Sequence, residues 1–174
     1  PVVLANARES EKSRAQAQKA IEVMGPAFGS FAAVLAQSDE DKARLESLGA
    51  KDVLVTGSVK FDIVPDASQM AAAKAWLTVL SRPVVLLAST RDGEEAAFLE
   101  SFKKHPALLA ETLVVVVPRH PERFERVVEL FESAGLKTIR RSTLSTAEDL
   151  PADIQIVVGD SMGEMSFYCG VASM

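Results

Sequence analysis

Residues 112–124 read Thr-Leu-Val-Val-Val-Val-Pro-Arg-His-Pro-Glu-Arg-Phe, and this stretch decides the fold class of the chain. Its valine-rich run stops abruptly at Pro118, which is typical of a buried strand in a parallel sheet. Pro121 stands where a helix would begin, because its missing N–H needs no partner there. Arg119 and His120 therefore fall between the carboxyl end of a strand and a helix N-terminus. Ligands bind at that edge of open α/β sheets, and the position favours an anion such as a phosphate.

The composition limits the classes of protein that the chain can belong to. It has 174 residues, of which 48% are hydrophobic, so it can form one large core or two small ones. A low aromatic content and many Ala, Val and Leu residues favour an α/β protein over a β-sandwich. The net charge of −5 argues against a nucleic-acid partner, which normally requires a basic face. A single cysteine excludes a disulfide framework, and no apolar run is long enough to span a membrane.

Apolar runs and amphipathic segments alternate along the chain, and their order predicts its architecture. Strands are expected at residues 1–6, 31–36, 52–55, 83–88, 113–117, 137–140 and 154–158. Helices are expected at 10–24, 38–48, 67–80, 94–104, 121–134 and 160–169, with Gly25-Pro26 ending the first of them. This alternation predicts parallel sheets with right-handed crossovers. The periodicity is lost around residues 57–66, which predicts two α/β domains at 1–66 and 67–174.

Polar clusters follow several of these strands, and each has a structural alternative to ligand binding. Lys60 can reach an anion or lie in a solvated linker. Ser89 and Thr90 offer hydroxyls to a phosphate or a sugar. Alternatively, Asp92 caps the next helix, and Glu95, three residues later, completes a capping box.

The remaining clusters hold the most specific candidates. The planar fork of Arg119 matches two phosphate oxygens, while His120 can donate to the same group or cap local carbonyls. Gly159 and Gly163 bracket a turn whose backbone N–H groups can meet a nucleotide, and Asp160 is alternatively a helix N-cap. The two histidines of the chain lie on different turns and lack partners at zinc spacing, so no metal site is expected.

Six segments, taken in order, resemble a single family. They are Leu-Ala-Asn-Ala-Arg (4–8), Leu-Ala-Gln-Ser (35–38), Val-Thr-Gly-Ser-Val-Lys-Phe-Asp (55–62), Ala-Ser-Thr-Arg-Asp-Gly-Glu-Glu (88–95), Val-Pro-Arg-His-Pro-Glu-Arg-Phe (117–124) and Gly-Asp-Ser-Met-Gly-Glu-Met (159–165). The ordered set is similar to the 3-deoxy-D-manno-octulosonic acid (Kdo) transferases of lipopolysaccharide core biosynthesis. The resemblance implies parts of two Rossmann-like domains of a GT-B glycosyltransferase. Residues 1–66 would hold the end of the acceptor-side domain plus the linker, and residues 67–174 the start of the nucleotide-sugar-binding domain.

The resemblance also implies the substrates and the residues that contact them. The donor would be CMP-Kdo, and the acceptor would be lipid A or its lipid IVA precursor at the cytoplasmic face of the bacterial inner membrane. A cation at the donor phosphate stabilises the charge that grows on the leaving CMP, and no cofactor or divalent metal is implied. By motif position, the donor would contact Lys60, Ser89, Thr90, Pro118, Arg119, His120, Met162, Gly163 and Glu164.

The chain also departs from the family pattern. Arg91 stands where members usually have histidine, which leaves the role of that position open. The family's general base, acceptor groove and membrane anchor precede residue 1, and the rest of its nucleotide pocket follows Met174. We therefore expect a soluble fragment from the middle of the enzyme that is inactive alone and reaches the membrane only through a missing N-terminal segment. Exposed apolar edges near Val2 and near residues 171–174 would allow weak homo-oligomers.

Two alternatives remain open from the sequence. Another GT-B nucleotide-sugar enzyme, such as a non-hydrolysing UDP-N-acetylglucosamine 2-epimerase, also carries a Val-Thr-Gly turn before its linker. A non-catalytic nucleotide- or phosphate-binding module would retain the same polar turns without the chemistry. The sequence does not determine how many Kdo residues are added or which lipid is preferred.

Overall fold

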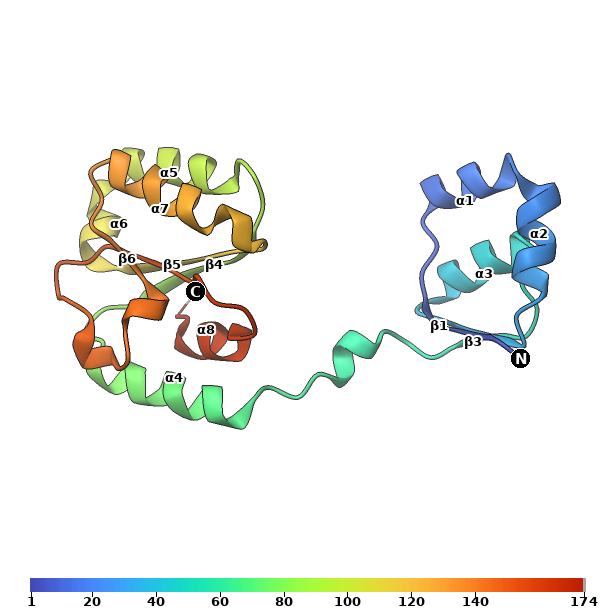
Figure 1. Cartoon of the computed structure of the whole chain (residues 1–174), viewed down its shortest axis with the longest axis horizontal. Coiled ribbons are helices and arrows are strands. Elements are labelled where there is room, and N and C mark those ends of the chain that lie inside the picture. The colour runs from blue at the N-terminus through green and yellow to red at the C-terminus, as the bar shows by residue number, and fades with distance from the viewer. Residues whose placement is uncertain (174) are drawn as a thin grey trace. The chain divides into compact units, whose positions relative to one another are not determined.

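The computed structural model divides the chain into two compact units, Pro1–Val64 and Pro65–Met174. Each unit contains a parallel sheet with helices packed against it (Figure 1), which confirms the expected α/β fold class. The structure describes residues 1–173, so Met174, the last residue of the second expected domain, lies outside it. Within residues 1–173, no helix combines the length and the apolar character that crossing a membrane requires. The assignment of the units to acceptor and donor sides stays a prediction.

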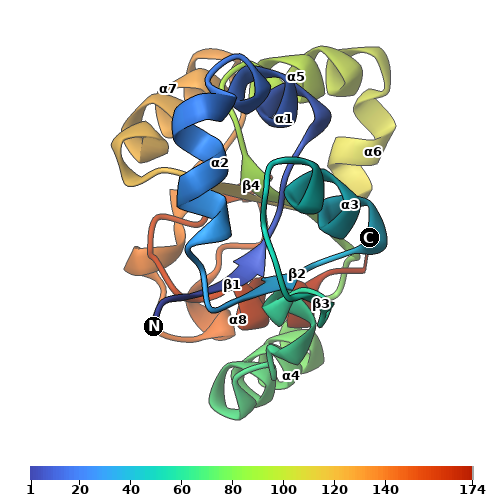
Figure 2. The same ribbon diagram turned by 90° about the vertical axis from the view of Figure 1, so that its right-hand side faces the viewer.

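The first unit is built on a three-stranded parallel sheet in the order β1-β2-β3. Figures 1 and 2 show its helices on one face of this sheet, where they cover a small core that includes Val34, Leu45 and Val53. Ser38 caps α3 as expected, because its side chain accepts a hydrogen bond from the Asp41 N–H at 3.2 Å. The elements are β1 (Val3–Ala7), α1 (Glu11–Gln18), α2 (Ile21–Gly29), β2 (Ala33–Ala36), α3 (Asp39–Ser47), β3 (Val53–Val55) and the 3₁₀ turn η1 (Val59–Asp62).

The single helix expected at residues 10–24 is wrong. The chain instead forms two helices, and the second continues through Gly25-Pro26 as far as Gly29. Packing explains why the glycine–proline pair does not end it. A Cβ added to Gly29 would lie 3.2 Å from the Gly49 carbonyl oxygen, and one added to Gly49 would lie 3.0 Å from the Gly25 oxygen. This close approach of α2 to the turn after α3 maintains the helix although Pro26 removes one of its hydrogen bonds.

The second unit is built on a four-stranded parallel sheet in the order β4-β5-β7-β6. Every residue of β5 is buried, as the valine-rich run predicts. In Figure 1, α5 and α7 cover one face of the sheet, and α4 and α8 cover the other. The elements are α4 (Ala67–Val79), β4 (Val84–Thr90), α5 (Glu94–Lys104), α6 (Pro106–Glu111), β5 (Leu113–Pro118), η2 (Pro121–Arg123), α7 (Phe124–Ser133), β6 (Thr138–Arg140), η3 (Arg141–Thr143), η4 (Ala147–Asp149), β7 (Ile156–Val158) and α8 (Met165–Val171).

Several element ends in the second unit differ from the expectation. Pro121 does occupy the first helical position, but it opens the 3₁₀ turn η2 that leads into α7. The helix expected at 160–169 begins only at Met165, because Gly163 has a positive φ of 86° that interrupts helical geometry. The short helix α6 was not expected from the sequence.

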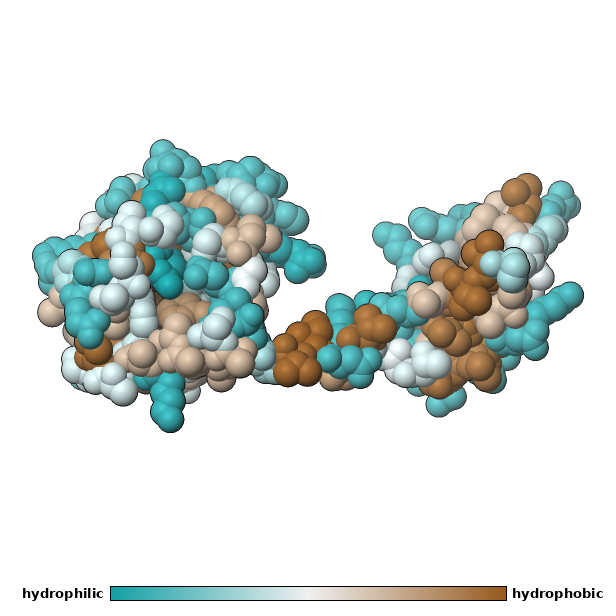
Figure 3. All heavy atoms as spheres, turned by 60° about the horizontal axis from the view of Figure 1, so that its bottom comes forward, coloured by the Kyte–Doolittle hydropathy of each residue, from teal (hydrophilic) through white to brown (hydrophobic). Residues whose placement is uncertain are grey.

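Of the two exposed apolar edges expected from the sequence, the one near Val2 is exposed and the one near Val171 is not. Val2 is 63% exposed, and Figure 3 shows hydrophobic side chains gathered on the surface of the first unit. The expectation of an exposed edge near residue 171 is wrong, because Val171 is 1% exposed and belongs to the core between α4, α8 and the sheet. The Ser173 N–H donates to the Val84 carbonyl at 2.8 Å, so the chain after α8 is attached to β4.

Candidate functional site

A small pocket lies at the carboxyl edge of the second sheet, where the neighbouring strands β4, β5 and β7 end. Its volume is about 70 Å³. Sites that enclose a whole small-molecule ligand usually measure roughly 300–1,000 Å³, so this pocket has room for one group of a larger ligand. Six of the nine residues expected to contact the donor line it, namely Ser89, Pro118, Arg119, Met162, Gly163 and Glu164.

Ser89 reaches the pocket because β4 is irregular at its end. Ala88 pairs with Val117 and Thr90 pairs with Pro118, so Ser89 is the extra residue of a β-bulge. Its φ of 55° lies in the left-handed region, which residues other than glycine rarely adopt. Bulges and backbone strain of this kind are enriched next to functional sites.

Arg119 lies at the rim of the pocket and is the most available cation there. Its guanidinium is exposed, and it makes no hydrogen bond or ion pair with any residue in the range 1–173. Its backbone is fixed, since the Arg119 N–H donates to the Thr90 carbonyl at 3.0 Å. The buried ring of Pro118 forms part of the wall. His120 is exposed and does not line the pocket.

Thr90 lies beside the pocket but does not line it. Its side chain is buried, and its hydroxyl donates to Glu95 Oε1 at 2.5 Å. The interpretation of Asp92 as the N-cap of α5 is wrong, because Gly93, with a φ of 89°, occupies that position. The neighbouring glutamate, Glu94, accepts the Arg91 N–H at 2.8 Å. Glu95 is therefore not used as a cap, and its side chain is buried at the start of α5, where it contacts Thr90.

Arg123 is a half-buried residue near the site that sequence reasoning missed. Its Nη2 donates to Glu95 Oε2 at 2.7 Å, and its Nη1 donates to the Thr90 carbonyl at 2.7 Å. The sequence does carry one signal of this arrangement. Glu95 stands four and seven residues before Leu99 and Phe102, which is the spacing of the buried stripe of α5.

The loop after β7 forms the other side of the pocket. Its Glu164 accepts hydrogen bonds from the Ser161 hydroxyl and, at 3.2 Å, from the Tyr168 hydroxyl. Gln69 of α4 donates to the Gly163 carbonyl at 2.8 Å and so attaches the loop to α4. Met162 is exposed at the pocket rim. Burial raises the pKa of the Tyr168 phenol above its usual value, so this hydroxyl stays protonated.

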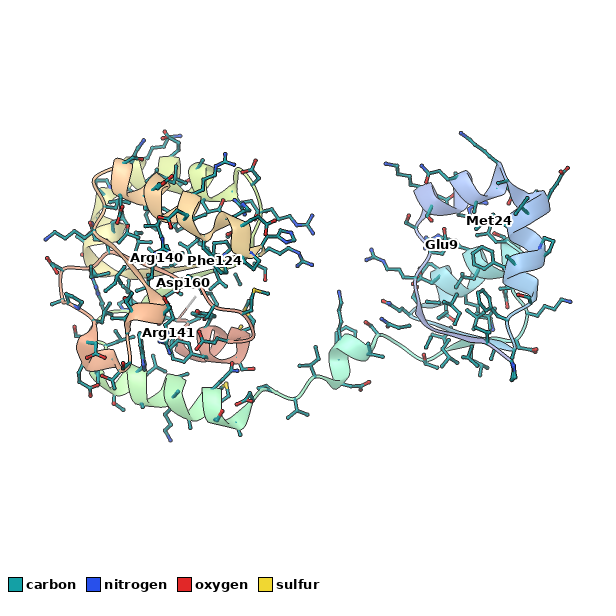
Figure 4. All side chains as sticks on the ribbon, in the orientation of Figure 1. Glu9, Met24, Phe124, Arg140, Arg141 and Asp160 are labelled. Atoms are coloured by element: carbon teal, nitrogen blue, oxygen red, sulfur yellow. The ribbon has the colours of Figure 1, made fainter. Side chains whose placement is uncertain are left out.

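Residues of β6 and of the turn η3 that follows it also stabilise this loop. Asp160 accepts from the Ser142 N–H at 2.8 Å and from its hydroxyl at 2.6 Å. Its interpretation as a helix N-cap is wrong, because Glu164 occupies the N-cap position of α8. Figure 4 shows Asp160 close to Arg140, and their charged groups are 3.9 Å apart. The Arg141 guanidinium lies 4.7 Å from the ring centre of Phe167 and 3.6 Å from Glu164. This cation–π contact and ion pair orient Glu164 toward the pocket.

Lys60 belongs to the first unit, where it is exposed on η1. That turn is attached to the end of β1, because the Val59 N–H donates to Asn6 Oδ1 at 3.3 Å. Asn6 itself has a φ of 54°. Within residues 1–173, His, Cys, Asp and Glu side chains do not cluster in threes as a metal ion requires.

The chain is similar to known proteins over its whole length. A family model described as 3-deoxy-D-manno-octulosonic-acid transferase (kdotransferase) matches residues 1–63. The 3-deoxy-D-manno-octulosonic acid transferase of Bordetella pertussis is 40% identical over 177 residues, which cover 100% of this chain and 41% of the relative. The transferase of the same name from Haemophilus influenzae is 34% identical over 182 residues, again 100% of this chain and 41% of the relative. The chain thus spans about two fifths of the length of these curated relatives.

A solved structure extends the likeness to the fold. The C-terminal CMP-Kdo binding domain of WaaA from Acinetobacter baumannii superposes with a TM-score of 0.55 at 31% sequence identity. The match covers 63% of this chain and 56% of that domain. The chain is therefore similar from one end to the other to 3-deoxy-D-manno-octulosonic acid transferases, and its fold agrees with that of the solved domain.

Proposed function

We propose that the second unit binds the phosphate of CMP-Kdo through Arg119, as part of an enzyme that transfers Kdo from CMP-Kdo to lipid A or its lipid IVA precursor. One observation carries the proposal: an exposed guanidinium without a partner in residues 1–173 stands at the rim of a pocket at the sheet's carboxyl edge. The similarity to a domain described as CMP-Kdo binding supports the choice of ligand.

The proposed chemistry assigns each pocket residue a task in donor binding. When the bond between Kdo and CMP breaks, negative charge grows on the CMP phosphate, and Arg119 would stabilise it through two parallel hydrogen bonds. The Ser89 hydroxyl and the backbone around Gly163 would contact the same end of the donor. Pro118, Met162 and Glu164 would shape the wall, and a divalent metal is not required.

The other expected donor contacts have weaker support. His120, exposed next to Arg119, would reach the part of the donor that extends beyond the small pocket. Lys60 is proposed from its motif position alone. The buried hydroxyl of Thr90 is occupied by Glu95, so Thr90 is better suited to holding the site than to contacting the donor.

We place the lipid acceptor on the side of the first unit and the complete protein at the cytoplasmic face of the bacterial inner membrane. The similarity to 3-deoxy-D-manno-octulosonic acid transferases supports both statements. The general base that activates the acceptor hydroxyl is not among the residues proposed here. This chain by itself is therefore proposed to bind the donor without completing the transfer.

Calorimetric titration of the chain with CMP, and with UMP as the control nucleotide, tests the proposal. Arg119→Ala should weaken CMP binding about tenfold or more, which is about 1.4 kcal/mol or more. Arg126→Ala is the matched control, because it removes the same charge from a 74% exposed side chain that does not line the pocket. Absence of CMP binding by this chain, and by a longer protein that contains it, contradicts the proposal. Equal affinity for UMP contradicts the assignment to a cytidine nucleotide.

A further inference from the structure

We propose that the buried ion pair Glu95–Arg123 is a positioning device that fixes the turn carrying Arg119, and so sets the affinity of the proposed phosphate contact. This inference rests on the proposed function and deepens it, because it names residues outside the pocket that determine the geometry inside it.

Glu95 is buried, Arg123 is half-buried beside it, and directional hydrogen bonds orient both side chains. The side chain of Glu95 is 2% exposed and that of Arg123 is 13% exposed. Each Glu95 oxygen has its own donor, since Oε2 accepts from Arg123 at 2.7 Å and Oε1 accepts from the Thr90 hydroxyl at 2.5 Å. Burying charges is costly unless they are paired and hydrogen-bonded. A movement that broke these hydrogen bonds would leave a charge without its partner, so the side chains of Glu95 and Arg123 have little freedom to move.

The Thr90 carbonyl connects the ion pair to Arg119. This oxygen accepts two hydrogen bonds, one from Arg123 Nη1 at 2.7 Å and one from the Arg119 backbone N–H at 3.0 Å. The path from the ion pair to the proposed phosphate contact therefore passes through one shared acceptor at the end of β4. A displacement of Arg123 moves this acceptor, and with it the backbone from which the Arg119 side chain extends.

Stability alone is a weak reason for placing these charges here. Glu95 lies on the same buried stripe of α5 as Leu99 and Phe102, where an apolar side chain would fit the pattern. Well-packed apolar replacements of buried ion pairs are often neutral or stabilising. In addition, Arg123 Nε is buried without a partner in the described part of the chain, which is unfavourable. The directional hydrogen bonds to Thr90 are what an apolar pair cannot supply.

The substitution Arg123→Lys tests whether CMP binding depends on the directed hydrogen bonds of Arg123 or only on its positive charge. Lysine keeps the positive charge, but its single ammonium lacks the planar fork with which Arg123 bonds Glu95 and the Thr90 carbonyl in fixed directions. CMP binding is measured for four proteins: the parent chain, Arg119→Ala, Arg123→Lys and the double variant. We expect Arg123→Lys to weaken CMP binding about fivefold in the parent and not at all in the Arg119→Ala background.

The outcome of this cycle is decisive in either direction. The same fold loss in both backgrounds means that Arg123 does not act through Arg119 and overturns the inference, as does an unchanged affinity. Fluorescence of Trp76, the single tryptophan of the chain, checks that each variant folds. If Arg123→Lys does not fold, Glu95→Gln replaces it in the cycle, because the amide keeps its shape but removes the ionic partner.

Hydrogen exchange at the Arg119 amide gives a readout that needs no nucleotide. In Arg123→Lys we expect its protection to fall, while amides in the middle of β5, such as that of Val115, keep theirs. Unchanged protection overturns the inference. If protection falls but the parent chain binds no CMP, the positioning role stands and only the proposed ligand is contradicted.

Discussion

Replacing Gly159 by alanine should destabilise the second unit, because the space for a methyl group is already filled. A Cβ at this position would lie 2.8 Å from both Cζ and Oη of Tyr168 and 3.0 Å from Cγ2 of Val117. Nonbonded carbon atoms normally pack at about 3.5–4.0 Å. Tyr168 is 1% exposed, so its ring cannot move aside without disturbing the core or the pocket loop.

The size of the effect follows from three contributions. Overpacking of a core costs about 1–3 kcal/mol. Displacing the Tyr168 hydroxyl from Glu164, at 3.2 Å, and Ser161, at 3.3 Å, adds about 1–3 kcal/mol. The reduced entropy of the unfolded chain offsets about 0.4–1 kcal/mol. The net loss is therefore about 1–6 kcal/mol, which at a urea m-value of about 2 kcal/mol/M lowers the urea midpoint by about 0.5–3 M.

Urea unfolding followed by Trp76 fluorescence measures this loss. Trp76 is the only tryptophan, and its ring centre lies 5.2 Å from that of Phe167, so its emission reports on the second unit. Gly163→Ala is the matched control in the same loop. Among residues 1–173, no atom lies within 4 Å of its Cβ position, so the positive φ is what opposes the substitution, at about 1–2 kcal/mol. A midpoint for Gly159→Ala equal to or above that of the parent refutes the packing argument.

Three further predictions follow from the second unit. Gly170→Ala should lower the urea midpoint, because its Cβ would lie 2.6 Å from Ala73 Cβ where α8 meets α4, and adding Ala73→Gly should restore most of the loss. Burial raises the pKa of Tyr168, the only tyrosine, so the unfolded chain releases the phenolic proton first. The contribution of Tyr168 to stability should be constant below about pH 10 and decrease above it, and Tyr168→Phe should lose this part of the alkaline decrease. Phenolate absorbance that rises before unfolding would contradict the assignment. CMP affinity should fall as salt rises from about 0.1 to 1 M, because the Debye length shrinks from about 10 to 3 Å, and a salt-independent affinity would argue against an ionic contact.

The sequence predicts those parts of the fold that local pattern determines. The valine run of β5 and the proline at the start of η2 are both found where the pattern places them. Six residues expected at the donor site meet in one pocket, because carboxyl ends of neighbouring parallel strands share an edge of the sheet. Their roles in binding stay predictions.

The failures come from tertiary contacts that override local signals. Gly25-Pro26 is typical of a helix end, yet the fit of Gly29 against Gly49 continues α2 past it. The spacing of Asp92 and Glu95 matches a capping box, but Glu95 pairs with Arg123 from another helix, which no local pattern shows. Arg141 stacks against aromatic rings distant in sequence in the same way.

The most direct test of the central claim compares CMP with cytidine, which lacks the phosphate, on the parent chain and on Arg119→Ala. If Arg119 contacts the phosphate, the substitution should weaken CMP binding about tenfold or more and leave cytidine binding unchanged. Equal weakening of both ligands would mean that Arg119 acts on the nucleoside or on the fold. Undiminished CMP binding would contradict the proposed phosphate site.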